Sequence, residues 1–114
     1  MITLWHNPRC SKSRQALALL EPVTKVEVRN YLEDTPSAAE IKAALDALGL
    51  PAIDMMRSGE KRFKELGLSR SSHDETLIAA MAEHPILIER PIAILGPRAV
   101  IGRPPENVLE LVHA

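Results

Sequence analysis

The first thirty residues contain a strand pattern, a helix pattern and a second strand pattern in direct succession. A short apolar run predicts a strand over 2–5, and apolar residues at helical spacing predict a helix over 11–20. Polar and apolar residues alternate over 25–31, which predicts a second strand. A helix between two strands in so short a stretch favours a βαβ unit with parallel strands and a right-handed crossover.

The middle of the chain is predicted to be helical. Residues 37–40, Ser-Ala-Ala-Glu, match a capping box, and the helix that they open is expected to end at Gly49. Residues 72–75, Ser-His-Asp-Glu, are a second match and open a helix that Pro85 stops. Two shorter helices are expected between them, over residues 51–57 and 60–66.

The end of the chain returns to sheet. An apolar strand is predicted over 91–95, a Gly-Pro turn follows, and a returning strand is predicted over 98–101. A last short helix is expected over 105–112, with Val108, Leu109 and Val112 turned inward. The order β-α-β, helical insert at about 37–85, β-β-α is that of an α/β, thioredoxin-like domain spanning residues 1–114.

Composition excludes several classes of function. The chain has 114 residues, a formal net charge of -1 and 3% aromatic residues, which gives no support for a nucleic-acid or membrane-surface role. Its apolar stretches are too short to span a bilayer, and no signal peptide is visible. We therefore expect a single domain in the cytoplasm with no membrane partner.

The chain has one cysteine, Cys10, at the predicted junction between strand and helix. The free N–H groups and the positive dipole end of a helix start favour an anion, so the thiol pKa should fall there. Arg9, Lys12 and Arg14 add positive charge, although they could also form a solvated face. These features favour a nucleophile over a buried structural cysteine. One thiol and scattered histidines give no metal-ligand spacing, and no metal is expected.

Six blocks of sequence carry a resemblance to a known family, and they run nearly from end to end. They are HNPRCSKSR at 6–14, YLE at 31–33, Arg57, ELGL at 65–68, HPILIERPI at 84–92 and IGRPPE at 101–106. Taken together and in this order, they resemble the arsenate reductase family of the glutaredoxin-coupled type, and within it a shorter subgroup.

The resemblance implies a thioredoxin-like core with a helical insert, and it assigns roles to individual residues. Cys10 matches the nucleophile that attacks arsenate, and His6 matches a histidine that supports the cysteine loop. The arginines that hold the oxyanion match Arg57, Arg90 and Arg103. Residues assigned to supporting the site or binding glutathione are Arg9, Ser13, Arg14 and Pro91, the last matching a cis-proline beside the active site.

The sequence also departs from its relatives. Characterised enzymes often have Gly-Thr directly after the cysteine, whereas this chain has Ser11 and Lys12. Transcriptional regulators of the same superfamily bind RNA polymerase and carry Cys-x-x-Cys. Ser13 occupies the second cysteine position here, which argues against that redox switch.

The chemistry agrees with the resemblance. Arsenate is a tetrahedral oxyanion, and the planar guanidinium group binds such anions through two parallel hydrogen bonds. Arg90 and Arg103 each precede a proline, which biases their backbones to an extended form. Spacing alone favours ordinary surface charges for the three arginines, and the sequence motifs around them reverse that interpretation.

A chain with one cysteine cannot resolve a thiol adduct internally. A second thiol must come from outside, and glutathione is the obvious cytosolic donor, with glutaredoxin reducing the mixed disulfide. No bound cofactor is expected. The sequence thus predicts thiol-dependent reduction of arsenate to arsenite. Two alternatives are a glutathione-linked monothiol oxidoreductase acting on another substrate, and a non-catalytic redox-sensing or protein-binding module.

Overall fold

The structure is a computed structural model that describes residues 1–112. It divides into two compact units, one formed by residues 1–34 with the chain from 90 onward, the other by residues 35–89. Across residues 1–112, no helix is both long and apolar enough to cross a bilayer.

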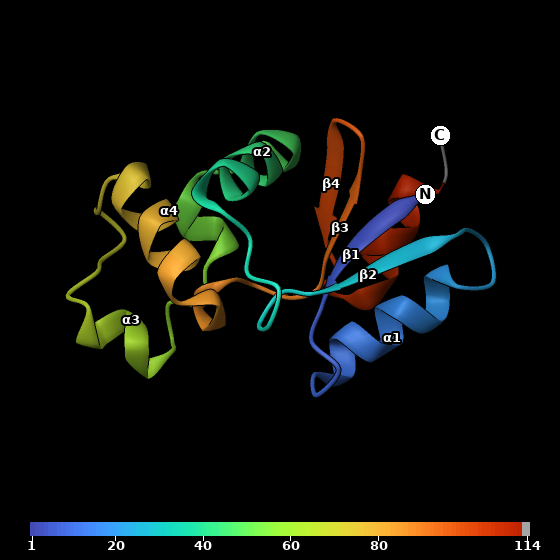
Figure 1. The fold of residues 1–114 in the computed structure, drawn as a ribbon, viewed down its shortest axis with the longest axis horizontal. Coiled ribbons are helices and arrows are strands. Elements are labelled where there is room, and N and C mark those ends of the chain that lie inside the picture. The colour runs from blue at the N-terminus through green and yellow to red at the C-terminus, as the bar shows by residue number, and fades with distance from the viewer. Residues whose placement is uncertain (113–114) are drawn as a thin grey trace. The chain divides into compact units, whose positions relative to one another are not determined.

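The first unit is built on a four-stranded sheet (Figure 1). Its strands are β1 (Ile2–His6), β2 (Val26–Asn30), β3 (Ile92–Leu95) and β4 (Arg98–Ile101), in the order β2-β1-β3-β4. β1 runs parallel to β2 and antiparallel to β3, and β3 forms a hairpin with β4. The predicted βαβ pairing of parallel strands is therefore confirmed.

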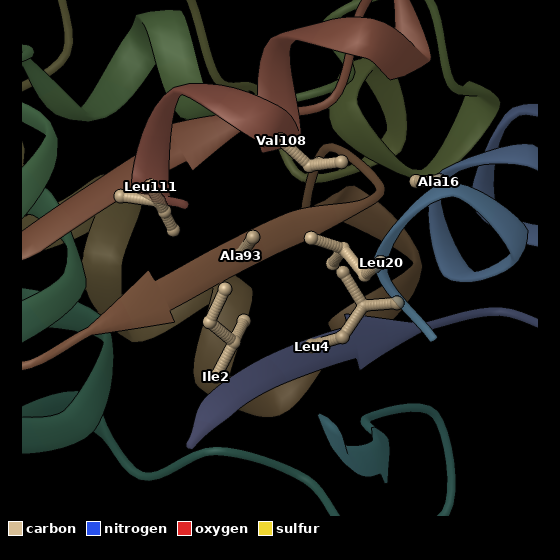
Figure 2. Close-up of a cluster of buried hydrophobic side chains, with 7 residues drawn as sticks. All are labelled: Ile2, Leu4, Ala16, Leu20, Ala93, Val108 and Leu111. Atoms are coloured by element: carbon tan, nitrogen blue, oxygen red, sulfur yellow. The ribbon is translucent and has the colours of Figure 1, made fainter. Parts of the chain in front are cut away.

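One face of this sheet carries the core of the unit. Helix α1 (Ser11–Leu20) packs against η3 (Pro105–Leu111), a 3₁₀ helix near the end of the chain. Figure 2 shows apolar side chains of the two helices pointing toward those of β1 and β3. The buried members of this cluster are Ile2, Leu4, Ala16, Leu20, Ala93, Val108 and Leu111.

The predicted thioredoxin-like order of elements is confirmed, with one change in the last helix. Pro105, Val108 and Leu111 are the buried residues of this helix, whereas Leu109 and Val112, predicted to turn inward, are half-buried and pack against the same core cluster. The reason is the helix type: a 3₁₀ helix has three residues per turn, so residues i and i+3 share a face.

The second unit is helical, as the sequence predicts. Its elements are α2 (Ala38–Leu48), η1 (Ala52–Met55), α3 (Lys61–Glu65), α4 (Asp74–Glu83) and η2 (Pro85–Leu87). α4 packs against α2, η1 and η2. The first capping box is confirmed, because Ser37 Oγ accepts from the Glu40 N–H at 3.1 Å and Glu40 Oε1 accepts from the Ser37 N–H at 3.0 Å. Gly49 ends α2 in the left-handed conformation with φ 69°.

The second predicted capping box, at residues 72–75, is wrong. His73 is the residue that precedes the first turn of α4, and its side chain makes no capping hydrogen bond. The Ser72 hydroxyl instead accepts a hydrogen bond from the Ser69 N–H at 3.0 Å. The Ser72 hydroxyl therefore stabilises a turn in the serine-rich loop instead of capping the helix. Ser side chains often form such local hydrogen bonds in competition with helix capping.

The sheet core gives a test of the fold. Leu20→Ala is expected to lower the free energy of unfolding by about 2–5 kcal/mol, because it leaves a cavity among packed side chains. Leu20 is 0% exposed, whereas Val23, in the turn that follows, is 55% exposed. Val23→Ala should therefore change the same quantity by less than about 0.5 kcal/mol. Chemical denaturation measures both, and equal losses would contradict the packing described.

Candidate active site

Cys10 sits at the end of a short loop that joins β1 to α1, and Asn7 fixes that loop. The Asn7 carbonyl accepts from the Cys10 N–H at 3.0 Å, and Asn7 Oδ1 accepts from the Arg9 N–H at 3.0 Å. Cys10 is thereby held with extended backbone, φ -95° and ψ 122°, directly before the first turn of α1. The sequence analysis missed this role of Asn7; the signal that could have revealed it is the tendency of an Asn side chain to accept a hydrogen bond from the backbone two residues on.

Ser13 and His6 form a buried pair beneath the loop. Ser13 Oγ lies 2.6 Å from His6 Nδ1 and accepts from the Asn7 N–H at 3.0 Å. Ser13 is fully buried, so its hydroxyl proton needs an acceptor, and His6 Nδ1 is the one within reach. Burial and the Arg14 charge lower the pKa of His6, with Glu21 opposing, which favours this neutral, accepting imidazole.

The surroundings of Cys10 favour its thiolate. Burial raises the pKa of the Cys10 thiol. The Ser13 N–H, the Arg90 guanidinium and the Lys12 N–H outweigh that effect, so the pKa lies below that of an ordinary thiol. The two N–H groups belong to the first turn of α1, which leaves them without partners inside the helix. The predicted position of Cys10 at the start of a helix is thus confirmed.

Two of the three predicted arginines lie beside Cys10. The charge and hydrogen-bonding capacity of the Arg90 guanidinium lower the pKa of the Cys10 thiol, and Arg103 Nη2 lies 3.9 Å from Cys10 Sγ. Arg103 Nε also donates to the Arg90 carbonyl at 2.8 Å, so the two arginines are joined to each other. Two guanidinium groups beside a thiolate can bind a tetrahedral oxyanion and stabilise the charge that develops as the sulfur attacks it.

The backbone segments that follow Arg90 and precede Arg103 lie close together. The Arg90–Pro91 peptide is cis, as predicted for Pro91, and so is the Arg103–Pro104 peptide. The Gly102 N–H donates to the Pro91 carbonyl at 2.8 Å, and a Cβ at Gly102 would lie 2.7 Å from Pro91 Cγ. Only glycine therefore fits at position 102, between the side chains of Pro91 and Val108.

The remaining predicted residues have other surroundings. Arg14 Nη1 donates to the Pro8 carbonyl at 2.9 Å and so supports the loop from outside, while the Arg9 side chain is exposed. Arg57 belongs to the second unit, where its Nη1 pairs with Glu60 Oε1 at 2.7 Å and its N–H donates to the Leu87 carbonyl. Its part in oxyanion binding stays a prediction.

Comparison with known proteins places this site in a family. The sequence pattern of the ArsC family matches residues 5–111, nearly the whole chain. The chain belongs to the ArsC family. The matched range includes Cys10, Arg90 and Arg103, and it spans elements of both units.

Individual relatives match along nearly their full length. The chain is 48% identical to the uncharacterized protein YfgD of Escherichia coli strain K12, over 97% of this chain and 96% of that protein. It is 46% identical to an arsenate reductase of Neisseria meningitidis serogroup A, over 94% of each. A solved structure of an arsenate reductase from Vibrio cholerae matches with a TM-score of 0.91 and 50% identity, over 96% of this chain and 95% of that one.

The environment of Cys10 predicts its reactivity. The rate of alkylation by iodoacetamide should rise with pH around a midpoint below about 8.5, the value of a model thiol. In Arg90→Gln the midpoint should move to higher pH, because a positive charge and a hydrogen bond to the thiolate are lost. Arg98→Gln removes an exposed arginine of β4 and should leave the midpoint where it is. If the native protein, Arg90→Gln and Arg98→Gln all have the same midpoint, Arg90 does not stabilise the Cys10 thiolate.

The close approach at Gly102 can be tested without substrate. Gly102→Ala should lower the free energy of unfolding by about 1–3 kcal/mol, because the added methyl group overlaps Pro91. It should also raise the alkylation midpoint of Cys10, since Arg90 and Arg103 adjoin the displaced residues. Gly59→Ala is the matched control, as a Cβ there meets nothing within 4 Å. Indistinguishable Gly102→Ala and Gly59→Ala proteins would refute the described contact.

Proposed function

We propose that this protein reduces arsenate to arsenite with Cys10 as the nucleophile and glutathione as the electron donor. The observation that carries the proposal is the thiol of Cys10, its pKa lowered, beside the guanidinium groups of Arg90 and Arg103. Membership of the ArsC family and 46% identity to an arsenate reductase support arsenate as the oxyanion. A role for Arg57 in holding the same anion rests on the family resemblance.

The first step is attack of the Cys10 thiolate on arsenic. A sulfur–arsenic bond forms, and one arsenate oxygen leaves as water after taking up protons from solvent. Arg90 and Arg103 neutralise the charge on the remaining oxygens, and bidentate guanidinium donors are suited to that geometry. Arsenic is still pentavalent at this stage, so no electrons have been transferred.

Reduction requires thiols from outside the chain. The thiolate of a first glutathione attacks the Cys10 sulfur, and the sulfur–arsenic bond breaks with its electron pair remaining on arsenic. Arsenite leaves, and Cys10 is joined to glutathione in a mixed disulfide. A second glutathione, directly or through a glutaredoxin, then attacks that disulfide and returns the Cys10 thiolate. Two glutathione molecules thus supply the two electrons. Reduced glutathione is the thiol expected for a protein that works in the cytoplasm.

Release of arsenite is the direct test of this function. The purified protein with arsenate, glutathione and glutaredoxin should form arsenite over many turnovers, and the Cys10→Ser variant should form none. A serine hydroxyl fits the same space but is a far weaker nucleophile at neutral pH. Mass spectrometry should find glutathione on Cys10 during turnover, and circular dichroism checks that the variant is folded.

Other outcomes point to other functions. Arsenite release by folded Cys10→Ser would refute a covalent thiol mechanism. Turnover with thioredoxin and no glutathione would refute the proposed electron donor. Glutathione exchange at Cys10 with no arsenite formed would favour a monothiol oxidoreductase with a different substrate.

A further inference from the structure

A pocket of about 240 Å³ lies beside the Cys10 loop, within the first unit. Its walls are two short segments, Asn7, Pro8 and Arg9 after β1, and Asn30, Leu32 and Glu33 at the end of β2 and beyond. β1 and β2 are parallel, with His6 opposite Asn30, so both segments leave the sheet at the same edge. Ligands of open α/β sheets bind outside the carboxyl ends of the strands.

Hydrogen bonds hold both walls of the pocket in place. On the β2 side, the Asn30 carbonyl accepts from the Glu33 N–H at 3.0 Å and the Asp34 N–H at 2.8 Å. On the β1 side, Arg14 Nη1 donates to the Pro8 carbonyl, next to the turn that Asn7 forms. The walls of this pocket are therefore already ordered before a ligand binds, and the entropic cost of ordering them on binding is small.

The walls carry one positive and one negative side chain. Arg9 and Glu33 both line the pocket, and within residues 1–112 neither side chain takes part in an ion pair or a side-chain hydrogen bond. The apolar surface comes from Pro8 and Leu32. A matching ligand carries an anion and a cation close together, next to a short aliphatic segment.

We propose that this pocket binds the zwitterionic γ-glutamyl end of the glutathione that reacts at Cys10. The inference rests on the proposed function, because it concerns the thiol donor of that reaction. The γ-glutamyl end has a carboxylate and an ammonium group on one carbon, followed by two methylenes. Arg9 pairs with the carboxylate and Glu33 with the ammonium group. The glycine end of glutathione has a carboxylate but no ammonium group, so it has no group that would pair with Glu33.

The position of the pocket fits this assignment. Arg9 is the residue directly before Cys10, and the Asn7 carbonyl holds the Cys10 N–H. Arg90 and Arg103 lie next to the sulfur and are left for the oxyanion. The thiol donor and the oxyanion thus have separate sets of charged residues, and glutathione can approach while arsenic is still bound.

Thiol–disulfide exchange tests the pocket without arsenate. In this exchange the Cys10 thiolate attacks one sulfur of a disulfide, forms the mixed disulfide and releases the other half as a thiolate. Mass spectrometry gives the rate with the disulfides of glutathione, of γ-glutamylcysteine, which lacks glycine, and of cysteinylglycine, which lacks the γ-glutamyl group. The native protein should react about five- to tenfold faster with the first two than with the third, as expected for charge-assisted hydrogen bonds.

The Glu33→Gln variant should lose most of this preference for γ-glutamyl disulfides. Glu27→Gln is the matched control, because Glu27 is an exposed residue of β2 that does not line the pocket. Alkylation by iodoacetamide, which has no γ-glutamyl group, checks that both variants retain the native reactivity of Cys10. A native protein without the preference, or equal loss in both variants, would overturn the assignment.

Arsenite release separates this inference from the proposed function. A γ-glutamyl preference that depends on Glu33, found in a protein that releases no arsenite, supports the pocket and refutes the arsenate reaction. If the protein releases arsenite but exchanges with all three disulfides at the same rate, the arsenate reaction is supported and binding of the γ-glutamyl end in the pocket is refuted.

Discussion

The pairing of β1 with strands on both sides is the constraint on which the site depends. β1 is parallel to β2 and antiparallel to β3, so its C-terminal end lies beside the end of β2 and the start of β3. The β3–β4 pairing places Ile101 opposite Ile92 and so brings the end of β4 to the same edge. Cys10, Arg90 and Arg103 follow or precede these strand ends, which is why residues about ninety positions apart along the chain meet.

Local patterns in the sequence were enough to predict the elements but not every detail within them. The first capping box, the end of α2 at Gly49 and the β3–β4 hairpin depend on neighbouring residues and were predicted correctly. The capping box at residues 72–75 failed because the Ser72 hydroxyl had a competing donor at Ser69. The last helix lies where it is predicted, and all three of its predicted inward residues contact the core, but its 3₁₀ geometry buries Val108 fully and leaves Leu109 and Val112 half-buried.

The site was harder to predict, because its contacts join distant segments. The helix start explains part of the Cys10 environment from sequence alone, since the Lys12 and Ser13 N–H groups are close neighbours of the sulfur along the chain. The approach of Arg90 and Arg103 is predicted mainly from a family resemblance, helped by the proline after each of them, because spacing alone favours surface charges. The bond from Arg103 Nε to the Arg90 carbonyl, and the pocket between the two strand ends, required the folded chain.

The hydrogen bonds of Ser13 have a consequence for how this chemistry can evolve. Position 13 is where a dithiol enzyme of this fold carries its second cysteine, three residues after the first. Here that position is fully buried, and its hydroxyl is engaged by His6 and by the backbone of Asn7. A thiol is a weaker hydrogen-bonding group, so gaining an internal resolving cysteine would loosen the loop that orients the first. A cysteine substituted for Ser13 would therefore add a second thiol only by weakening the hydrogen bonds that hold the loop around Cys10.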